Sequence, residues 1–233
     1  NEKDHPEVAP SQFEINYGYG EVVAAGDQIQ LYKLICRQVA TKLGCTASFL
    51  PKPVVGVNGS GMHTNVSISK NGKNLFWDPK GEEKISELAW SFVDKVLSHA
   101  DDTCLILNSS VNSYRRLDPH FEAPNQIKAS PVDRGSMIRI PIGNEKSSRV
   151  EVRSVAPDAN PYLTLLAVFQ SGIDGEIANI KNLRQAERYL PDNIYTAIDN
   201  FRASGFAKKL LGADVVGRFA DLKQASADRC PRA

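Results

Sequence analysis

Apolar and polar residues alternate along the segment that follows Met62. Four odd-numbered positions in this segment carry polar side chains: His63, Asn65, Ser67 and Ser69. Val66 and Ile68 lie between them, and this two-residue period predicts a β-strand with one polar face. Because a glycine-rich loop leads into the strand and its polar face carries a histidine, that face is either ordinary solvent surface or the wall of a site.

Two further segments show the same alternation with charged side chains on one face. The polar positions are Arg149, Glu151 and Arg153 in RVEVRSV, and Gln12, Glu14 and Asn16 in QFEIN, with Glu7 just upstream of the latter. A half-solvated antiparallel sheet alternates in this way, and for one strand alone that is the ordinary interpretation. Glutamate, histidine and arginine on three strands together favour a polar concave site.

Helical periodicity dominates the rest of the chain. Apolar residues spaced three and four apart predict helices over residues 21–43 and 82–99, a helix from Asn160 onward and another after LPDN. The stripe of the first helix consists of Leu31, Leu34, Ile35, Val39 and Leu43. Short strands are predicted at ASFLP and SMIRIP, a hairpin at Asn71-Gly72, and mainly loop over the proline-rich residues 108–142. The sum is an α+β architecture with its sheet in the first two thirds of the chain.

Composition narrows the classes of partner. The 233 residues are 42% hydrophobic and carry a formal net charge of +1, which gives no global footprint for nucleic acid or an anionic membrane. The four cysteines have no C-x-x-C spacing, which favours reduced thiols and leaves cysteine ligation of zinc unsupported. The N-terminus is polar and no apolar run approaches the length of a membrane span of about 20 residues. We therefore expect a cytoplasmic protein.

The residue types on the polar strand faces restrict the chemistry. Three carboxylates and one imidazole, from Glu7, Glu14, Glu151 and His63, form an oxygen-rich ligand set that suits Mg²⁺ or Mn²⁺. Neighbouring arginines bind anionic oxygens in bidentate fashion. Sites of phosphoryl transfer use divalent cations and arginines to neutralise the phosphoryl oxygens. A single histidine on a strand, however, is more often structural.

Four long segments, in order, carry a resemblance to a known family. HPEVAPSQFE, KPVVGVNGSGMH, NSYRRLDPHFEAP and RVEVRSVAPDANPYL resemble the signature segments of the glutamine synthetase family, and the resemblance runs from residue 5 to about residue 215. It implies a curved antiparallel sheet, forming a half-barrel or funnel flanked by helices. It also implies two sites for Mg²⁺ or Mn²⁺ and ATP as a substrate.

The resemblance also assigns roles by position. Glu7 and Glu14 match ligands of one metal, and His63 and Glu151 match ligands of the other. Asn58, Gly59, Arg116 and Arg153 match positions that hold the amino acid substrate, and Arg134 matches the arginine that steadies the transferring phosphoryl group. The nucleotide side is matched by His5, Tyr19, Ser67, Arg139, Lys146 and Arg149. Glu122 matches a flap glutamate that takes a proton from the incoming amine.

The implied activity is an ATP-dependent ligase that joins glutamate to ammonia through γ-glutamyl phosphate. A γ-glutamyl-amine ligase with a methylamine- or polyamine-like acceptor is the alternative, and a non-catalytic, assembly-forming relative is another. The charged residues that the chain retains favour catalysis, because a scaffold has no need of them. Asn65 and Pro6, however, stand where histidines are common in the family.

The resemblance makes residues 1–233 a catalytic domain that starts at the HPEVA segment. The family's N-terminal β-grasp domain, and the strand with an earlier Glu-x-Glu pair of metal ligands, lie outside this chain. We therefore expect the chain by itself to lack ligase activity. We expect a complete protein to form a homo-oligomer whose active sites lie between subunits.

Overall fold

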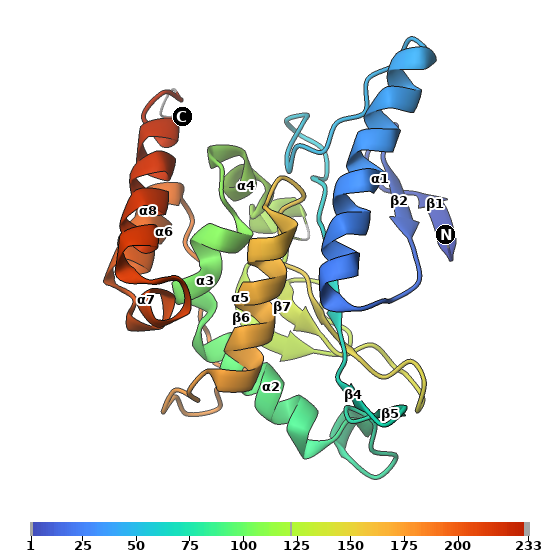
Figure 1. Ribbon diagram of the computed structural model, residues 1–233, viewed down its shortest axis with the longest axis vertical. Coiled ribbons are helices and arrows are strands. Elements are labelled where there is room, and N and C mark those ends of the chain that lie inside the picture. The colour runs from blue at the N-terminus through green and yellow to red at the C-terminus, as the bar shows by residue number, and fades with distance from the viewer. Residues whose placement is uncertain (1, 122, 231–233) are drawn as a thin grey trace.

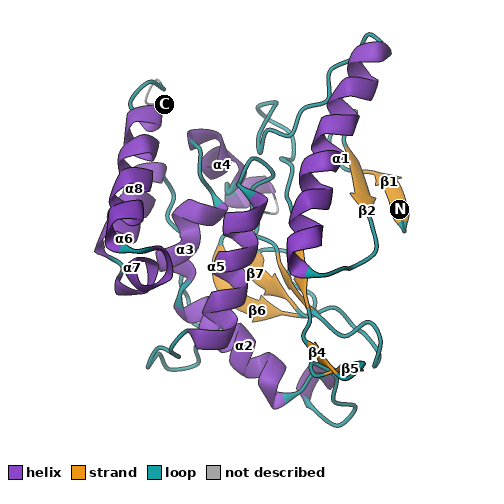
Figure 2. Ribbon diagram, viewed as in Figure 1, coloured by secondary structure: helices purple, strands orange, loops and turns teal. Residues whose placement is uncertain are grey.

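Helices surround a four-stranded sheet near the centre of the molecule, and a separate two-stranded sheet lies beside the first long helix (Figures 1 and 2). The computed structural model describes residues 2–121 and 123–230. The strands are β1 (Lys3–Pro6), β2 (Phe13–Asn16), β3 (Thr64–Val66), β4 (Ser69–Lys70), β5 (Lys73–Asn74), β6 (Gln126–Ser130), β7 (Ser136–Arg139) and β8 (Val150–Val152). The helices are α1 (Val22–Lys42), α2 (Glu87–Ser98), α3 (Ala100–Leu107), α4 (Val111–Arg116), α5 (Pro161–Asp174), α6 (Ile194–Ala203), α7 (Gly205–Leu211) and α8 (Ala213–Ala227). None of the described helices is at once long and apolar enough to cross a membrane.

The central sheet has the strand order β3-β8-β7-β6 and is mixed in direction. β8 is antiparallel to both β3 and β7, whereas β6 and β7 are parallel. The α+β class is therefore confirmed, but the prediction of a wholly antiparallel sheet was wrong at this pair. Alternation reports which face a residue occupies and carries no strand direction, so it could not have revealed the parallel pair. Closure of the sheets into a half-barrel stays a prediction.

A short loop, residues 131–135, joins the parallel strands β6 and β7. Pro131 follows β6 and has no N–H with which to continue the ladder. The hydroxyl of Ser130 accepts hydrogen bonds from the backbone N–H groups of residues 132 and 133, and Asp133 accepts one from Gly135 N. These local bonds order the loop between the two strands.

The hydrophobic core lies between the central sheet and the helices. Val150 and Val152 of β8 and Met137 of β7 are fully buried, as are Phe92 of α2 and Phe201 of α6. α5 packs on α2 and α3, and α3 packs in turn on α6. The apolar face of β8 thus faces the core, which leaves its opposite face to carry the charged residues.

The helix predicted over residues 21–43 is confirmed as α1, and its apolar stripe is exposed in the described part of the chain. Its members are exposed: Leu31 56%, Leu34 50%, Ile35 54%, Val39 48% and Leu43 74%. The helix contacts α5 through a different face, where Gly26 lies against Tyr162 and Lys33 bonds to the carbonyl of Pro157. On β2 the apolar face is also outward, with Phe13 69% exposed.

Several predicted boundaries change in the structure. The ASFLP segment forms no strand, and the helix predicted over residues 82–99 is a 3₁₀ turn, Glu82–Lys84, followed by α2. Ser86 begins α2 because its hydroxyl accepts a hydrogen bond from Ala89 N. The segment expected to be mainly loop contains α4 and β6. The hairpin is confirmed, since Asn71 and Gly72, with φ angles of 52° and 75°, join β4 to β5.

Candidate functional site

Three potential metal ligands converge at the two-stranded sheet. β1 and β2 are antiparallel, and their register places His5 directly opposite Glu14, so both side chains point to the same face. Glu7 follows β1, and its backbone N–H donates to the carbonyl of Gln12. The ligand atoms of His5, Glu7 and Glu14 lie within 4.8 Å of one another. The two predicted metal ligands therefore do come together, with His5 as a third group beside them.

The carboxylates of this trio crowd each other. The pKa of Glu14 is raised, first by burial and then by its hydrogen bond to Glu7 and the negative charge of that neighbour. The nearby His5 acts in the opposite direction, and Glu151 adds to the rise. Two carboxylates this close repel each other, and a bound cation would relieve that repulsion.

The second group of predicted ligands lies on the central sheet. Nδ1 of His63 is 3.4 Å from Oε1 of Glu151, whose side chain is only 6% exposed. β3 and β8 bring the two together, since Asn65, two residues after His63, is the register partner of Glu151. On the other side, Nη2 of Arg139 on β7 donates to Oε2 of Glu151 at 2.6 Å. Glu151 is thus shared between a predicted metal ligand and a predicted nucleotide-side arginine.

His63 is held as a neutral imidazole. Burial, followed by the positive charges of Arg116, Arg153 and Arg139, lowers the pKa of His63 to about 3. A neutral ring keeps one nitrogen lone pair free, which is the form that binds a metal ion. The three arginines that prevent protonation of His63 also form a positively charged wall beside Glu151.

Arg116 is anchored by the loop that follows β8. Its side chain is buried, and its guanidinium donates to the carbonyls of Arg153, Ser154 and Val155 at 2.9–3.3 Å. Burial and the charge of Arg153 lower the pKa of Arg116 to about 10. A charged group held this firmly keeps its orientation, as a substrate-binding arginine requires.

Two glycines make room for Arg116. A Cβ on Gly59 would lie 2.4 Å from the carbonyl oxygen of Pro51, and a Cβ on Gly61 would lie 2.5 Å from Nη2 of Arg116 and 2.8 Å from Nε2 of His63. The glycine-rich loop therefore passes close to both an arginine and a histidine of the site. Any side chain at residue 61 would displace one of them.

Arg153 lies beside the carboxylate of the second ligand group. Its Nε lies 3.3 Å from Oε1 of Glu151, and its Nη1 donates to the carbonyl of Arg134 at 3.1 Å. Burial lowers the pKa of Arg153, while Glu151 and Glu14 both raise it. The guanidinium of Arg153 is thus held between the carboxylate of β8 and the backbone just before β7.

The structure does not bring all predicted residues to this centre. Tyr19 is 95% exposed on the loop before α1, and Lys146 and Ser67 are exposed on loops. Arg149 donates through Nε to Asn65 Oδ1 at 2.9 Å, which ties the rims of β8 and β3. Asn58 is half-buried in the glycine-rich loop, and Arg134 is exposed before β7. The predicted flap residue Glu122 lies outside the described residues.

Two residues support the site without having been assigned a role. Gln12 Nε2 donates to the carbonyl of Gly59 at 2.9 Å and to Ser60 Oγ at 3.1 Å, which fastens β2 to the glycine-rich loop. Lys52 donates to the carbonyl of Val57 and places its ammonium 3.6 Å from the ring centroid of Phe121. The polar position of Gln12 opposite Phe13 was a signal for the first, whereas nothing local in the sequence indicated the second.

These residues fit divalent cations and an anionic substrate. Five potential ligands lie in two groups, four of them carboxylate or imidazole groups expected from the resemblance, and His63 is neutral. Carboxylate oxygens are the ligands that Mg²⁺ prefers in proteins, and Mn²⁺ accepts imidazole as well. The arginines beside them suit the carboxylates and phosphates of small substrates.

Comparisons with known proteins point to one family. The family model described as "Glutamine synthetase, catalytic domain" matches residues 1–232. Glutamine synthetase of Staphylococcus aureus (strain MRSA252) is 41% identical over 238 residues, covering 95% of this chain and 53% of that protein. Glutamine synthetase of Staphylococcus epidermidis (strain RP62A) is 40% identical with the same coverage. A solved structure titled "Apo GmaS without ligand" has a TM-score of 0.82 and 31% identity, covering 96% of this chain and 54% of that one.

The chain spans about half the length of these relatives. The family model nevertheless covers almost the whole chain, and the predicted metal ligands lie in two groups, Glu7 with Glu14 and His63 with Glu151. On these grounds the chain belongs to the glutamine synthetase family, of which it matches the catalytic domain.

Proposed function

We propose that the protein containing this chain is an ATP-dependent ligase. It forms the γ-amide of glutamate from glutamate and ammonia, by way of γ-glutamyl phosphate. The observation that carries the proposal is the geometry of the predicted metal ligands: Glu7 and Glu14 lie within 4.8 Å of each other, and His63 lies 3.4 Å from Glu151. The match to the glutamine synthetase catalytic domain supports the same chemistry.

The reaction requires activation of a poor electrophile. The γ-carboxylate of glutamate is not attacked by ammonia at a useful rate, and transfer of a phosphoryl group from ATP converts one oxygen into a leaving group. Mg²⁺ or Mn²⁺ held by Glu7, Glu14, His63 and Glu151 would supply neutralisation of the phosphoryl charge. Arg116 and Arg153 are fixed by backbone carbonyls and by Glu151, so they suit binding and orientation of the carboxylates of glutamate.

Other residues carry roles that the resemblance assigns. Arg134 and Arg139 would stabilise the negative charge of the transferring group, since both are charged and both lie beside Arg153 or Glu151. Asn58 and Gly59 would hold the amino group side of glutamate. Glu122 would attract the ammonium ion and remove its proton, which makes nitrogen a nucleophile.

Ammonia is the acceptor that we propose, because the relatives named glutamine synthetase are 40–41% identical to the chain. A small organic amine is the alternative acceptor. Both acceptors use the same activation step, so they are separated only by the identity of the amide product.

Exposed apolar surface supports an assembly in the complete protein. Covering Phe13 and the stripe of α1 would bury several large apolar side chains, at a gain of roughly 1.5–3 kcal/mol for each one fully buried. We propose that they are covered in a homo-oligomer with inter-subunit sites. Light scattering on the complete protein would give one defined large species if this holds.

The test of the activity uses the complete protein with ATP, glutamate and a panel of amines. The readouts are coupled ADP release and mass spectrometry of the amide. The matched variants are Glu14→Gln and Glu187→Gln, because Glu187 is exposed and distant from the predicted ligands in sequence. Glu14→Gln should lower the rate of amide formation by at least about 100-fold, and Glu187→Gln should leave it unchanged.

Glutamate-dependent ADP release with ammonia, and its loss in Glu14→Gln alone, would support the proposal. Amide formation only with a larger amine would establish the alternative acceptor. Absence of glutamate-dependent ATP turnover with every amine would refute ligase function. Full activity of Glu14→Gln would refute the metal assignment.

A further inference from the structure

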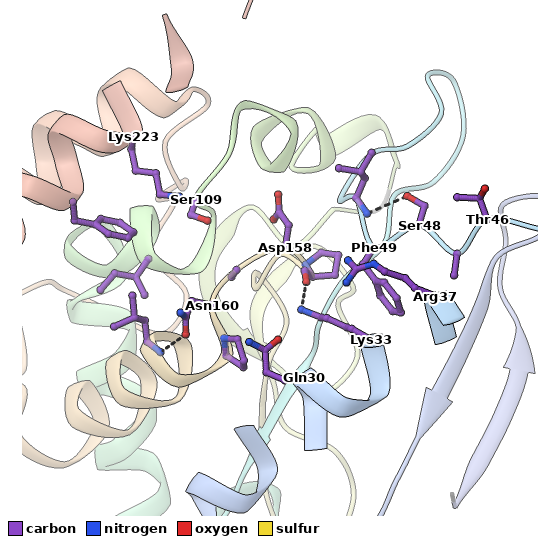
Figure 3. Close-up of a pocket in the computed structure, with 18 residues that line it drawn as sticks. Gln30, Lys33, Arg37, Thr46, Ser48, Phe49, Ser109, Asp158, Asn160 and Lys223 are labelled. Atoms are coloured by element: carbon purple, nitrogen blue, oxygen red, sulfur yellow. Dashed lines mark hydrogen bonds between the residues drawn. The ribbon is translucent and has the colours of Figure 1, made fainter. Parts of the chain in front are cut away.

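A cavity lies outside the set of predicted ligase-site residues. It has a volume of about 640 Å³ and is bounded by α1, the loop at residues 46–50, the segment that leads into α5, and α8 (Figure 3). None of its lining residues is among the predicted ligase-site residues. We call it the basic cavity, and its charged lining residues are Lys33, Arg37, Asp158 and Lys223.

The charges of the basic cavity are not balanced. Three cationic side chains face one carboxylate, a net of two positive charges. Asp158 already accepts hydrogen bonds from the hydroxyls of Ser110 and Ser113, at 2.6 and 3.2 Å. Among the described residues, none of the three cations forms an ion pair with a carboxylate. The cavity therefore has capacity for an anion.

Lys33 is the most buried of the three cationic side chains, and the excess positive charge affects its pKa. Its side chain is buried, 8% exposed, and its Nζ donates to the carbonyl of Pro157 at 2.5 Å, as Figure 3 shows. Burial and the positive charge of Arg37 lower the pKa of Lys33, and Asp158 opposes them. Burial also lowers the pKa of Lys223 on the opposite wall. A bound anion would relieve the repulsion among these groups.

The start of α5 does not supply the anion site. Asn160 caps the helix by accepting from the N–H groups of Tyr162 and Leu163, and Pro161 has no N–H. The backbone donors at this helix end are therefore already used. The side chains of α1 and α8 remain as the groups that would bind the ligand.

Apolar surface occupies the rest of the lining. Phe49 lies under Arg37, with the guanidinium carbon 5.1 Å from the ring centroid, and Phe219 lies under Lys223 at the same distance. Ile106 and other apolar side chains complete the wall. The volume falls within the range of roughly 300–1,000 Å³ that is typical of small-molecule sites. The lining thus suits a compact ligand with a charged head and an apolar body.

We propose that the basic cavity binds a small organic dianion, a phosphate monoester or a dicarboxylate that carries an apolar or aromatic group. Lys33, Arg37 and Lys223 contact the charged head, and Phe49 and Phe219 contact the apolar body. Two negative charges match the net charge of the cavity. This site is separate from the one that would bind ATP and glutamate.

The test measures binding to the complete protein by isothermal titration calorimetry. The probes are phenyl phosphate and phthalate, with benzyl alcohol as a neutral probe of similar size and inorganic phosphate as a head group without the apolar body. A saturating non-hydrolysable ATP analogue and glutamate are present throughout, so that the ligase site is filled. One molecule of phenyl phosphate or of phthalate should bind per chain, more tightly than either benzyl alcohol or inorganic phosphate.

Two variants and one control locate the site. Arg37→Gln and Lys223→Gln should each weaken binding of the dianion by about tenfold, because each removes one charged hydrogen bond. Lys42→Gln, at the exposed end of the same helix α1, should leave binding unchanged. Binding of phenyl phosphate alone would identify a phosphate monoester, and binding of phthalate alone a dicarboxylate. Saturable binding of neither dianion would refute the proposal, as would binding that survives both variants.

Discussion

A methyl group at residue 61 is the smallest change that tests the predicted site. In Gly61→Ala the new Cβ would lie 2.5 Å from Nη2 of Arg116 and 2.8 Å from Nε2 of His63. The backbone of Gly61 is outside the left-handed region, so alanine meets no conformational penalty there. The whole effect must come from the two contacts. Ordinary contact begins at about 3.4 Å, so one of the groups must move by about 1 Å.

The magnitude follows from how Arg116 is held. Its Nη2 donates to the carbonyl of Arg153 at 2.9 Å, and the side chain is 5% exposed. Displacing it breaks a charged hydrogen bond in a buried setting, which lowers the free energy of unfolding by about 1.5–3 kcal/mol. A misplacement of about 1 Å in a substrate-positioning group costs about 100-fold in rate. We therefore expect kcat/KM for glutamate to fall by about 100-fold, with a moderate loss of thermal stability.

The assay compares complete wild-type protein with Gly61→Ala and Gly20→Ala. Gly20 has no heavy atom within 4 Å of its would-be Cβ, so Gly20→Ala should retain normal activity and melting temperature. Coupled ADP release gives kcat/KM, and differential scanning calorimetry gives stability. If kcat/KM of Gly61→Ala stays within about threefold of the wild-type value, the glycine-rich loop does not position Arg116 and His63 for catalysis. The assignment of these two residues to the site would then be wrong.

Two further predictions concern stability and reactivity. Gly172→Ala places a methyl 2.1 Å from the buried ring of Phe92 and should lower the free energy of unfolding by about 1–3 kcal/mol. Gly217→Ala has open space around the new methyl in α8 and should raise the free energy of unfolding by about 0.5–1 kcal/mol. Urea denaturation that gives the same sign for both variants would contradict this prediction. Burial raises the pKa of Cys104 to about 12, so a thiol reagent should modify exposed Cys45 in the native protein and reach Cys104 only after denaturation. Rapid native labelling of Cys104, detected by mass spectrometry, would contradict its burial.

Local signals in the sequence account for much of the fold. Helices α1 and α5 begin within one residue of their predicted starts, and Asn71-Gly72 forms the predicted hairpin. These elements are predictable because they depend on the spacing of apolar residues and on turn residues that are close together in the sequence. The polar faces of β2, β3 and β8 were likewise visible, because alternation fixes which residues share a face.

Contacts between distant segments decided the rest. The alternating pattern could not show that β6 and β7 are parallel, nor that His5 lies opposite Glu14. The spacing of apolar residues in α1 predicted an apolar helix face, but it could not show whether this chain covers that face. Periodicity is a property of one helix, whereas burial depends on what surrounds the helix. The sequence by itself determined which side chains each strand or helix presents together. Only the tertiary structure decided that His63, Arg139 and Arg153 all lie beside Glu151, because contacts between segments far apart in the chain depend on how the strands pair.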